Sequence, residues 1–246
     1  MLSGGASAKS SPTDLVTDID RSSEALIVRA LLRARPDDGI QGEEGSSEKG
    51  STGITWVIDP LDGTINYLYG IGVFAVSIAA SHEGRSIAGV VHDPTTGEMF
   101  TASEGKGAFL DGHELRIEAS GRPLGEALVG TGFSYSAPSR AAQARLLSVL
   151  LPEVRDIRRG GSAALDLCSV ACGRLDAYYE AELKPWDRAA GGLVAREAGA
   201  GVITIDGLYP GSSTTLAAAP GLQAPLSELL RRAAGEADCR QGAGRQ

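Results

Sequence analysis

Apolar residues recur at helical spacing between positions 20 and 35, where Leu26, Leu31 and Leu32 alternate with charged side chains and Pro36 follows. Spacings of three and four residues are typical of an amphipathic helix, and proline cannot continue one. The sequence therefore predicts a helix over residues 20–35. A polar, glycine-rich loop is expected next, over residues 39–53.

From residue 55 the pattern changes to short apolar runs rich in β-branched residues, separated by turn residues such as Asp93-Pro94. Such runs are typical of strands joined by tight turns. We expect an antiparallel meander with strands at residues 55–58, 73–81, 85–92 and 98–103. A short hairpin is expected at residues 107–110 and 113–116, joined by Asp111-Gly112.

Beyond residue 141 the sequence alternates between helical and strand patterns, which implies strands enclosed by helices. We expect helices at 141–151, 162–173, 187–198 and 222–234, and strands at 156–159, 177–180, 201–205 and 215–218. The chain then divides into an N-terminal half (13–125) and a C-terminal half (126–234). Residues 1–12 are expected to form a mobile arm, and residues 235–246 a disordered tail.

The composition favours a stable globular protein and disfavours non-specific binding to nucleic acid. The 246 residues are 42% hydrophobic, and 31 acidic against 23 basic residues give a net charge of −8, which argues against nucleic-acid binding. Neither a membrane-spanning run nor a secretory leader is present, so a cytoplasmic location is expected. The three cysteines, an odd number without paired spacing, predict no disulfide framework.

The run from Asp59 to Thr64 (Asp-Pro-Leu-Asp-Gly-Thr) carries the densest chemistry. Pro60 is expected to end the preceding strand, which places Asp59 and Asp62 on either side of a bend where their carboxylates converge. Such a pair repels itself unless cations neutralise it. Gly63 permits close approach of a ligand, and a helical turn over residues 65–69 would present N–H groups to a phosphate. The alternative is an ordinary solvated turn.

Four other segments have both a functional and an ordinary interpretation. Gly42-Glu43-Glu44-Gly45 is either a metal-binding loop or a solvated acidic one. Asp187 is either a ligand or a helix cap. Gly160-Gly161-Ser162 opens a helix either as an anion site or as a tight turn. Three aspartates precede the first predicted helix, of which capping explains only one; they are Asp14, Asp18 and Asp20.

These segments, in this order, resemble the inositol monophosphatase family over nearly the whole chain. The resemblance rests on the Asp-Pro-x-Asp-Gly-Thr run, on Gly42-Glu43-Glu44 upstream and on Trp186-Asp187-x-Ala-Ala-Gly downstream. It implies a layered α/β fold, the alternating αβαβα sandwich of the inositol monophosphatase and sugar phosphatase type. Family members carry a further helix before the position of Lys9, and in this chain that first helix is expected to be missing.

The resemblance also implies a magnesium site. Glu43, Asp59 and the main-chain carbonyl of Leu61 would hold one Mg²⁺, and Asp59, Asp62 and Asp187 a second. A third ion would bind near Glu43, under an arm that carries Lys9. Thr64, hydrogen-bonded to Asp20, would orient the attacking water together with Glu43. The implied substrate-binding residues are Asp62, Gly63, Thr64, Gly161, Ser162, Ala163 and Glu180.

The implied activity is Mg²⁺-dependent, lithium-sensitive hydrolysis of myo-inositol monophosphate to inositol and phosphate, in a homodimer. The same chemistry could act on histidinol phosphate, fructose 1,6-bisphosphate or a 3′-phosphoadenosine nucleotide. Glu180 favours inositol, because a carboxylate can accept hydrogen bonds from two adjacent hydroxyls. An alternative from another class is a regulatory interaction protein with a phosphatase fold.

Overall fold

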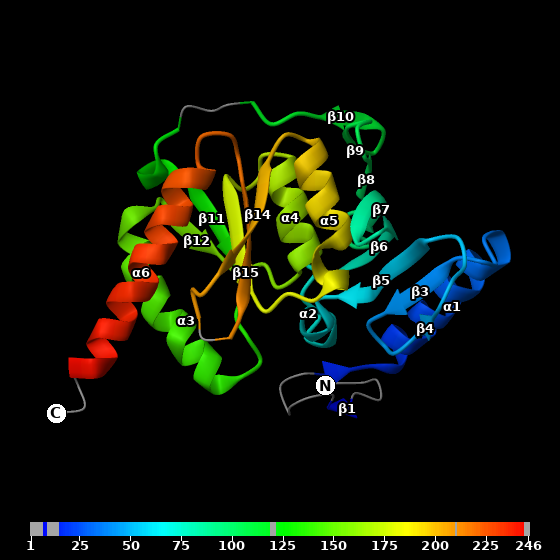
Figure 1. Cartoon of the computed structure of the whole chain (residues 1–246), viewed down its shortest axis with the longest axis horizontal. Coiled ribbons are helices and arrows are strands. Elements are labelled where there is room, and N and C mark those ends of the chain that lie inside the picture. The colour runs from blue at the N-terminus through cyan, green and yellow to red at the C-terminus, as the bar shows by residue number, and fades with distance from the viewer. Residues whose placement is uncertain (1–6, 9–14, 119–121, 210, 244–246) are drawn as a thin grey trace.

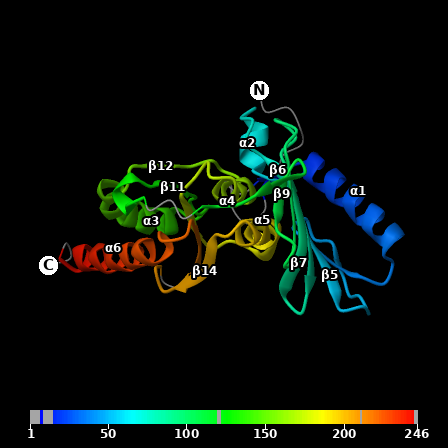
Figure 2. The ribbon, with the colours of Figure 1, turned by 90° about the horizontal axis from the view of Figure 1, so that it is seen from above.

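The computed structural model describes residues 7–8, 15–118, 122–209 and 211–243. These residues form five layers, in which the two large β-sheets are separated by a pair of helices and covered on their outer faces by further helices (Figures 1 and 2). The predicted αβαβα sandwich is therefore confirmed. Lys9 and most of the predicted N-terminal arm lie outside the described residues. Ser7–Ala8 (β1) pairs antiparallel with Leu15–Val16 (β2).

The first sheet contains the predicted meander. Its strands follow the order β10-β9-β8-β7-β6-β5-β3-β4, and all neighbours are antiparallel except β3 and β5, which are parallel. The strands are β3 (Gly39–Gly42), β4 (Ser47–Glu48), β5 (Ile54–Asp62), β6 (Ala75–His82), β7 (Arg85–His92), β8 (Met99–Ser103), β9 (Ala108–Leu110) and β10 (His113–Leu115).

The loop predicted over residues 39–53 was wrong, because β3 and β4 both lie inside it. The glycines in this segment allow two stretches of backbone to pack closely, and they do not form a flexible loop. A Cβ atom on Gly50 would lie 2.2 Å from the main-chain nitrogen of Gly39, so only glycine fits there. The high glycine content of this segment was therefore wrongly interpreted as a sign of a loop.

The second sheet has the order β12-β11-β13-β15-β14, with β11 parallel to both of its neighbours and the other pairs antiparallel. Strand β11 had not been predicted, because its four residues include Gly130 and a glycine follows it. The strands are β11 (Leu128–Thr131), β12 (Asp156–Arg158), β13 (Ala177–Ala181), β14 (Gly201–Asp206) and β15 (Ser213–Ala218).

Helices form the remaining three layers (Figure 2). Helix α1 (Asp18–Ala34) covers the outer face of the first sheet, α4 (Ala163–Ala171) and α5 (Pro185–Glu197) lie between the sheets, and α3 (Ala137–Leu150) and α6 (Gln223–Ala243) cover the second sheet. Short α2 (Thr64–Leu68) follows β5, and Leu124–Glu126 and Leu151–Glu153 are 3-10 turns. Because α6 continues to Ala243, the tail expected from residue 235 is helical over most of its length.

The core between the sheets joins the two halves. Ala75, Val91 and Phe100 of the first sheet pack against Cys168 of α4 and Leu193 of α5. Burial of this kind contributes roughly 25 cal/mol per Å² of apolar surface. Cys168 is a buried free thiol, as expected for a core position. Among the described residues, no helix is both long and apolar enough to cross a bilayer.

Candidate active site

A β-bulge brings Asp59 and Asp62 to the same side of β5. Asp59 pairs with Ser77 of β6 and Asp62 with Ala75, so three steps along β5 match two along β6. In a regular strand, residues three apart face opposite sides, and the extra residue removes that difference. Strand β5 continues through Pro60, contrary to prediction, because a bulge needs no ladder hydrogen bond from that residue.

Glu43 lies beside Asp59 because its loop is hydrogen-bonded to strand β5 and to helix α1. The main-chain nitrogen of Glu43 donates to the carbonyl of Ile58 at 3.1 Å, which fixes the loop against β5. The buried carboxylate of Glu24 in α1 accepts hydrogen bonds from the main-chain nitrogens of Glu44 and Ser46, at 2.8 and 2.9 Å. Sequence reasoning missed Glu24, although an acidic residue at a helix position facing the sheet is a usable signal.

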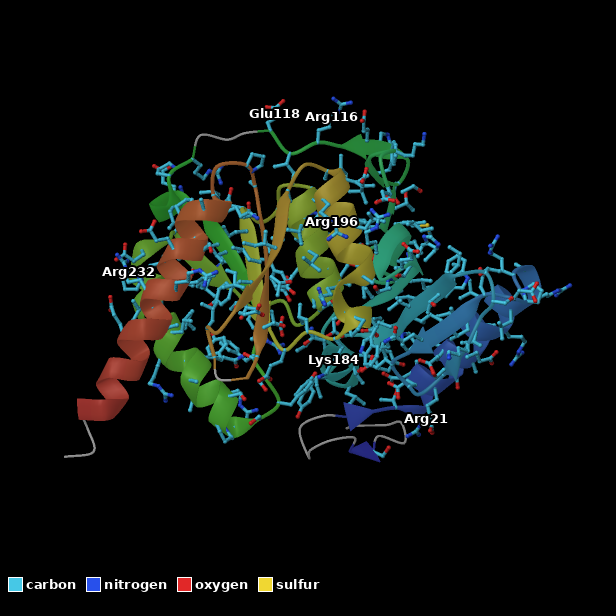
Figure 3. All side chains as sticks on the ribbon, viewed as in Figure 1. Arg21, Arg116, Glu118, Lys184, Arg196 and Arg232 are labelled. Atoms are coloured by element: carbon cyan, nitrogen blue, oxygen red, sulfur yellow. The ribbon has the colours of Figure 1, made fainter. Side chains whose placement is uncertain are left out.

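Asp187 enters the site from the other half of the chain, in the first turn of α5. Its Oδ2 atom accepts a hydrogen bond from the main-chain nitrogen of Lys184 at 2.6 Å, so it does cap the helix. Its neighbours nevertheless include the negative charges of Asp62 and Glu43. Capping and a place in the acidic cluster are therefore compatible. Figure 3 shows Lys184 at the start of α5, between the two halves.

The four carboxylates of Glu43, Asp59, Asp62 and Asp187 destabilise one another's charge. Burial, then the charges of Glu43, Asp62 and Asp187, hold the pKa of Asp59 well above its ordinary value. Burial also raises the pKa of Asp62 to about 6, against hydrogen bonds from Ser162 and Ala164 that lower it. Burial is also the main cause of the raised pKa of Asp187.

This donor set fits a hard divalent cation in its chemistry. It consists of buried carboxylate oxygens whose repulsion a cation would relieve, and oxygen ligands suit Mg²⁺. Within the described part of the chain, no three His, Cys, Asp or Glu side chains already converge as a preformed metal centre. A hydrogen bond between Glu43 and Asp59 contributes to the raised pKa of Asp59 and shows that the two carboxyl groups lie within hydrogen-bonding distance.

The carboxylates open into a cavity of about 520 Å³ between the two halves. Residues of both halves line it, and Asp187 of the second half lies with the carboxylates of the first half. The cavity is lined by Glu43, Asp59, Leu61, Asp62, Gly63, Thr64, Phe133, Ser134, Tyr135, Ser136, Arg159, Gly161, Ala163, Glu180, Ala181, Glu182, Leu183, Lys184, Trp186 and Asp187. Its volume is in the range of small-molecule sites.

Thr64 stands at the start of α2, where Gly63 adopts a left-handed conformation with φ of 95°. The Thr64 hydroxyl lies 2.8 Å from Oδ1 of Asp20 and 3.0 Å from the carbonyl oxygen of Leu61. The other carboxylate oxygen of Asp20 accepts hydrogen bonds from Thr17 in the capping box of α1. The contact between Asp20 and Thr64 expected from the resemblance is present.

Asp62 connects the first half to the start of α4. Its Oδ2 atom accepts hydrogen bonds from the Ser162 hydroxyl at 2.6 Å and the main-chain nitrogen of Ala164 at 2.7 Å. Ser162 is the N-cap of α4 and is buried, and it does not line the cavity, whereas Gly161 and Ala163 do. One carboxylate oxygen of Asp62, Oδ2, therefore accepts its hydrogen bonds from the start of α4.

Glu180 lies at the end of β13, on the cavity wall of the second half. Its Oε2 atom accepts a hydrogen bond from the hydroxyl of buried Tyr178 at 2.5 Å. Burial raises the pKa of Glu180 to about 7, although this hydrogen bond lowers it. The room for its carboxylate comes from Gly132, since a Cβ atom there would lie 1.9 Å from Oε2. Sequence reasoning missed Tyr178, Gly132 and the lining residue Arg159.

Comparisons with known proteins find relatives of this chain in sequence and in fold. The sequence profile of the inositol monophosphatase family matches residues 3–238. An "Inositol-1-monophosphatase" of Mycobacterium leprae is 47% identical over 239 residues, 93% of this chain and 82% of that protein. A "Nus factor SuhB" of Xylella fastidiosa is 50% identical over 195 residues, 79% of this chain and 70% of that protein.

Solved structures show the same relationship. The extragenic suppressor protein SuhB of Bartonella henselae is 37% identical and superimposes with a TM-score of 0.84, covering 92% of this chain and 89% of that one. The structure titled "Thermotoga maritima IMPase TM1415" is 31% identical, with a TM-score of 0.83 over 95% of this chain and 89% of that one.

Proposed function

The chain belongs to the inositol monophosphatase family, and from that membership we propose that it is a Mg²⁺-dependent phosphomonoesterase that hydrolyses myo-inositol 1-phosphate. One observation carries the proposal. Four carboxylates that repel one another share a cavity with Glu180, a carboxylate suited to a polyol. The wall that carries Glu43, Asp59, Asp62 and Asp187 would serve phosphoryl transfer, and the wall that carries Glu180 would serve the leaving group.

Glu43, Asp59, Asp62, Asp187 and the main-chain carbonyl of Leu61 would hold two Mg²⁺, with a third near Glu43. Bound Mg²⁺ would supply activation of the attacking water and stabilisation of the leaving oxygen. Bound Mg²⁺ would also stabilise the ionised carboxylates, because their buried charges would then have a counter-ion.

Thr64 would orient the attacking water through its hydroxyl oxygen. Because the Thr64 hydrogen is directed to Asp20 or to the Leu61 carbonyl, the oxygen keeps its lone pairs for a hydrogen bond from water. Glu43 lies on the same wall and would accept a second hydrogen bond from that water. The amides of Gly63 and Thr64 would bind phosphoryl oxygens, where preformed donors stabilise developing charge.

Glu180 would bind the leaving group by accepting hydrogen bonds from two adjacent hydroxyls of inositol. Tyr178 holds one carboxylate oxygen of Glu180 in place, which fixes the direction of the other. Gly161 and Ala163 line the cavity next to it and would contribute main-chain contacts, together with Asp62 and the N-cap Ser162. This set favours a polyol phosphate over a phosphate monoester with an apolar leaving group.

A phosphate-release assay tests the proposal. The purified chain is compared on inositol 1-phosphate, histidinol phosphate, fructose 1,6-bisphosphate and a 3′-phosphoadenosine nucleotide, with Mg²⁺, with EDTA and with added lithium. We expect the fastest turnover on inositol 1-phosphate, dependence on Mg²⁺ and inhibition by lithium. Asp59→Asn should be inactive, while Asp111→Asn, a matched change in the exposed β9–β10 turn, should match wild type. Full activity in EDTA would refute the metal-dependent mechanism.

A second candidate role is that of a regulatory interaction protein, which the name "Nus factor SuhB" of the Xylella fastidiosa relative supports. The two roles separate experimentally. If a partner captured by the wild-type chain is captured equally by Asp59→Asn, the interaction does not need the catalytic carboxylates. The homodimer expected from the resemblance stays a prediction, to be checked by sedimentation.

A further inference from the structure

Asn66 joins the two halves of the chain directly behind the cavity. It lies in α2 with 5% of its surface exposed. Its side-chain nitrogen donates to the carbonyl of Val73 at 2.8 Å and to the carbonyl of Gly160 at 2.9 Å. A primary amide has two N–H groups, so both are used. One hydrogen bond stays within the first half, and the other crosses to the turn before α4.

The two backbones meet at this point without an intervening side chain. A Cβ atom on Gly63 would lie 2.8 Å from the Val73 carbonyl oxygen and 3.2 Å from that of Gly161. A Cβ atom on Gly161 would lie 2.7 Å from the Asn66 nitrogen. The glycines therefore permit the approach, and the Asn66 amide fixes it from behind.

The two segments that Asn66 joins face different parts of a bound substrate. All four of Gly63, Thr64, Gly161 and Ala163 line the cavity. In the proposed function Gly63 and Thr64 belong to the wall that binds the phosphoryl group, and Gly161 and Ala163 to the wall that binds the leaving group. Asn66 itself does not line the cavity. We propose that Asn66 is a positioning residue that sets the spacing between these walls, an inference that rests on the proposed function.

This spacing matters more to the transition state than to the bound substrate. A substrate can bind through either wall, but reaction requires the phosphoryl group and the leaving oxygen to be held together in line. Misplacement by about 1 Å can cost roughly 100-fold in rate. Loss of Asn66 should therefore lower kcat more than it raises KM, and only for substrates that use both walls.

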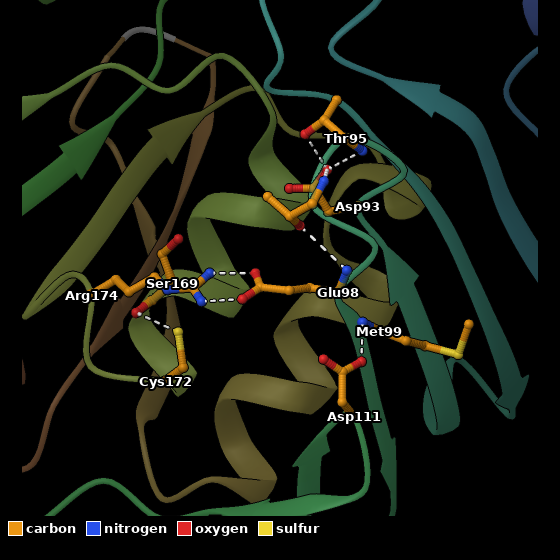
Figure 4. A network of polar contacts seen from close by, with 9 residues as sticks. Asp93, Thr95, Glu98, Met99, Asp111, Ser169, Cys172 and Arg174 are labelled. Atoms are coloured by element: carbon orange, nitrogen blue, oxygen red, sulfur yellow. Dashed lines mark hydrogen bonds and ion pairs between the residues drawn. The ribbon is translucent and has the colours of Figure 1, made fainter.

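A second link between the halves provides a matched control. Arg174, in the turn after α4, donates to both carboxylate oxygens of Glu98, in the turn before β8 (Figure 4). Neither residue lines the cavity. Arg174→Met removes a connection between the same two halves but leaves the Gly160 turn untouched.

The test compares Asn66→Asp with Arg174→Met and with wild type. Asp has the shape of Asn but presents carboxylate oxygens to both carbonyls. On inositol 1-phosphate we expect Asn66→Asp to lower kcat about 10- to 100-fold with KM changed less than about threefold. On 4-nitrophenyl phosphate, whose leaving group lacks the hydroxyls of a polyol, we expect less than about a threefold change. Arg174→Met should keep wild-type kinetics on both substrates.

Hydrogen–deuterium exchange provides a readout that does not need turnover. The amides of residues 160–164 should exchange faster in Asn66→Asp than in wild type, and at the wild-type rate in Arg174→Met. Should Asn66→Asp not fold, Asn66→Ala, which removes the donors without adding charge, gives the same comparison.

Two kinds of failure are distinguishable. Equal losses on both substrates, or unchanged exchange at residues 160–164, would overturn the positioning role. Absence of Mg²⁺-dependent turnover of inositol 1-phosphate by the wild-type chain would instead refute the proposed function.

Discussion

The hydroxyl oxygen of Thr64 lies 2.8 Å from Oδ1 of Asp20, across 44 residues of sequence. The same aspartate completes the capping box of α1, so the start of that helix and the start of α2 are fixed relative to each other. The orientation of the Thr64 hydroxyl is therefore set by a helix on the outer face of the first sheet.

We expect Thr64→Val and Asp20→Asn each to lower kcat about 100-fold. In the proposed function Thr64 orients the attacking water and Asp20 orients the Thr64 hydroxyl, so either change would disturb the same contact. Since the two residues act as one unit, the double variant should lose little more than either single variant. Steady-state kinetics of the four proteins measures this coupling, and Thr64→Ser, which keeps the hydroxyl, is the control. Additive losses would show that Asp20 acts independently of Thr64.

Magnesium should stabilise the protein more at high pH than at low pH. The carboxyl pKa values of Asp59, Asp62 and Asp187 are raised in the fold, so without a cation stability falls as pH rises from about 4 through those values. A cation that binds the charged forms opposes this loss. At a hundredfold excess over Kd it would contribute about 2.7 kcal/mol. Thermal unfolding at pH 5 and pH 8, with Mg²⁺ or EDTA, measures the difference. An equal rise in Tm at both pH values would contradict it.

Gly132→Ala should displace Glu180 without unfolding the protein. The added Cβ would overlap the carboxylate, the movable end of a side chain, rather than the backbone. We expect KM for inositol 1-phosphate to rise about tenfold, roughly the loss of one hydrogen bond to a charged group, while turnover of 4-nitrophenyl phosphate is kept. Gly125→Ala, at a site where a Cβ meets only the Glu153 carbonyl oxygen at 4.0 Å, should change neither. Unchanged KM in Gly132→Ala would show that Glu180 does not contact the substrate.

Asp38 should stabilise the fold at neutral pH and lose that effect in acid. A hydrogen bond from Arg35, with others from Thr52 and Trp56, lowers the pKa of Asp38 to about 2. Because the folded pKa is depressed, the contribution is present above pH 4 and is lost as pH falls toward 2. Asp38→Asn should therefore lower Tm at pH 6, with the difference from wild type shrinking toward pH 2. A difference independent of pH would mean that the charge of Asp38 contributes nothing.

Hydrophobic periodicity predicted most elements, since the expected helix over residues 20–35 and the strand over residues 85–92 lie within two residues of α1 and β7. It could not predict that β5 continues through Pro60, because the bulge depends on pairing with β6. Nor could it predict β3 and β4, where Gly50, just after β4, packs against the backbone at the start of β3.

The sequence identified residues with distinctive chemistry but not those that support them. Asp59, Asp62 and Asp187 occur in recognisable runs, and the cavity brings them together. Asn66 and Tyr178 have no such signal. An amide in a short helix gains its role only from Gly160, which a distant segment supplies. A tyrosine in a strand gains its role only from the hydrogen bond to Glu180, two residues further along β13.

The placement of α4 and α5 between the sheets has a consequence for synthesis on the ribosome. The inner face of the first sheet packs against Ala164, Leu193 and their neighbours in these two helices, which are made only after the whole sheet. At elongation rates of about 5–20 residues per second, synthesis from the end of β10 to the end of α5 would take on the order of 4–16 seconds, and until then these helices could not cover the sheet. During that interval its apolar face is available to chaperones and to other nascent chains.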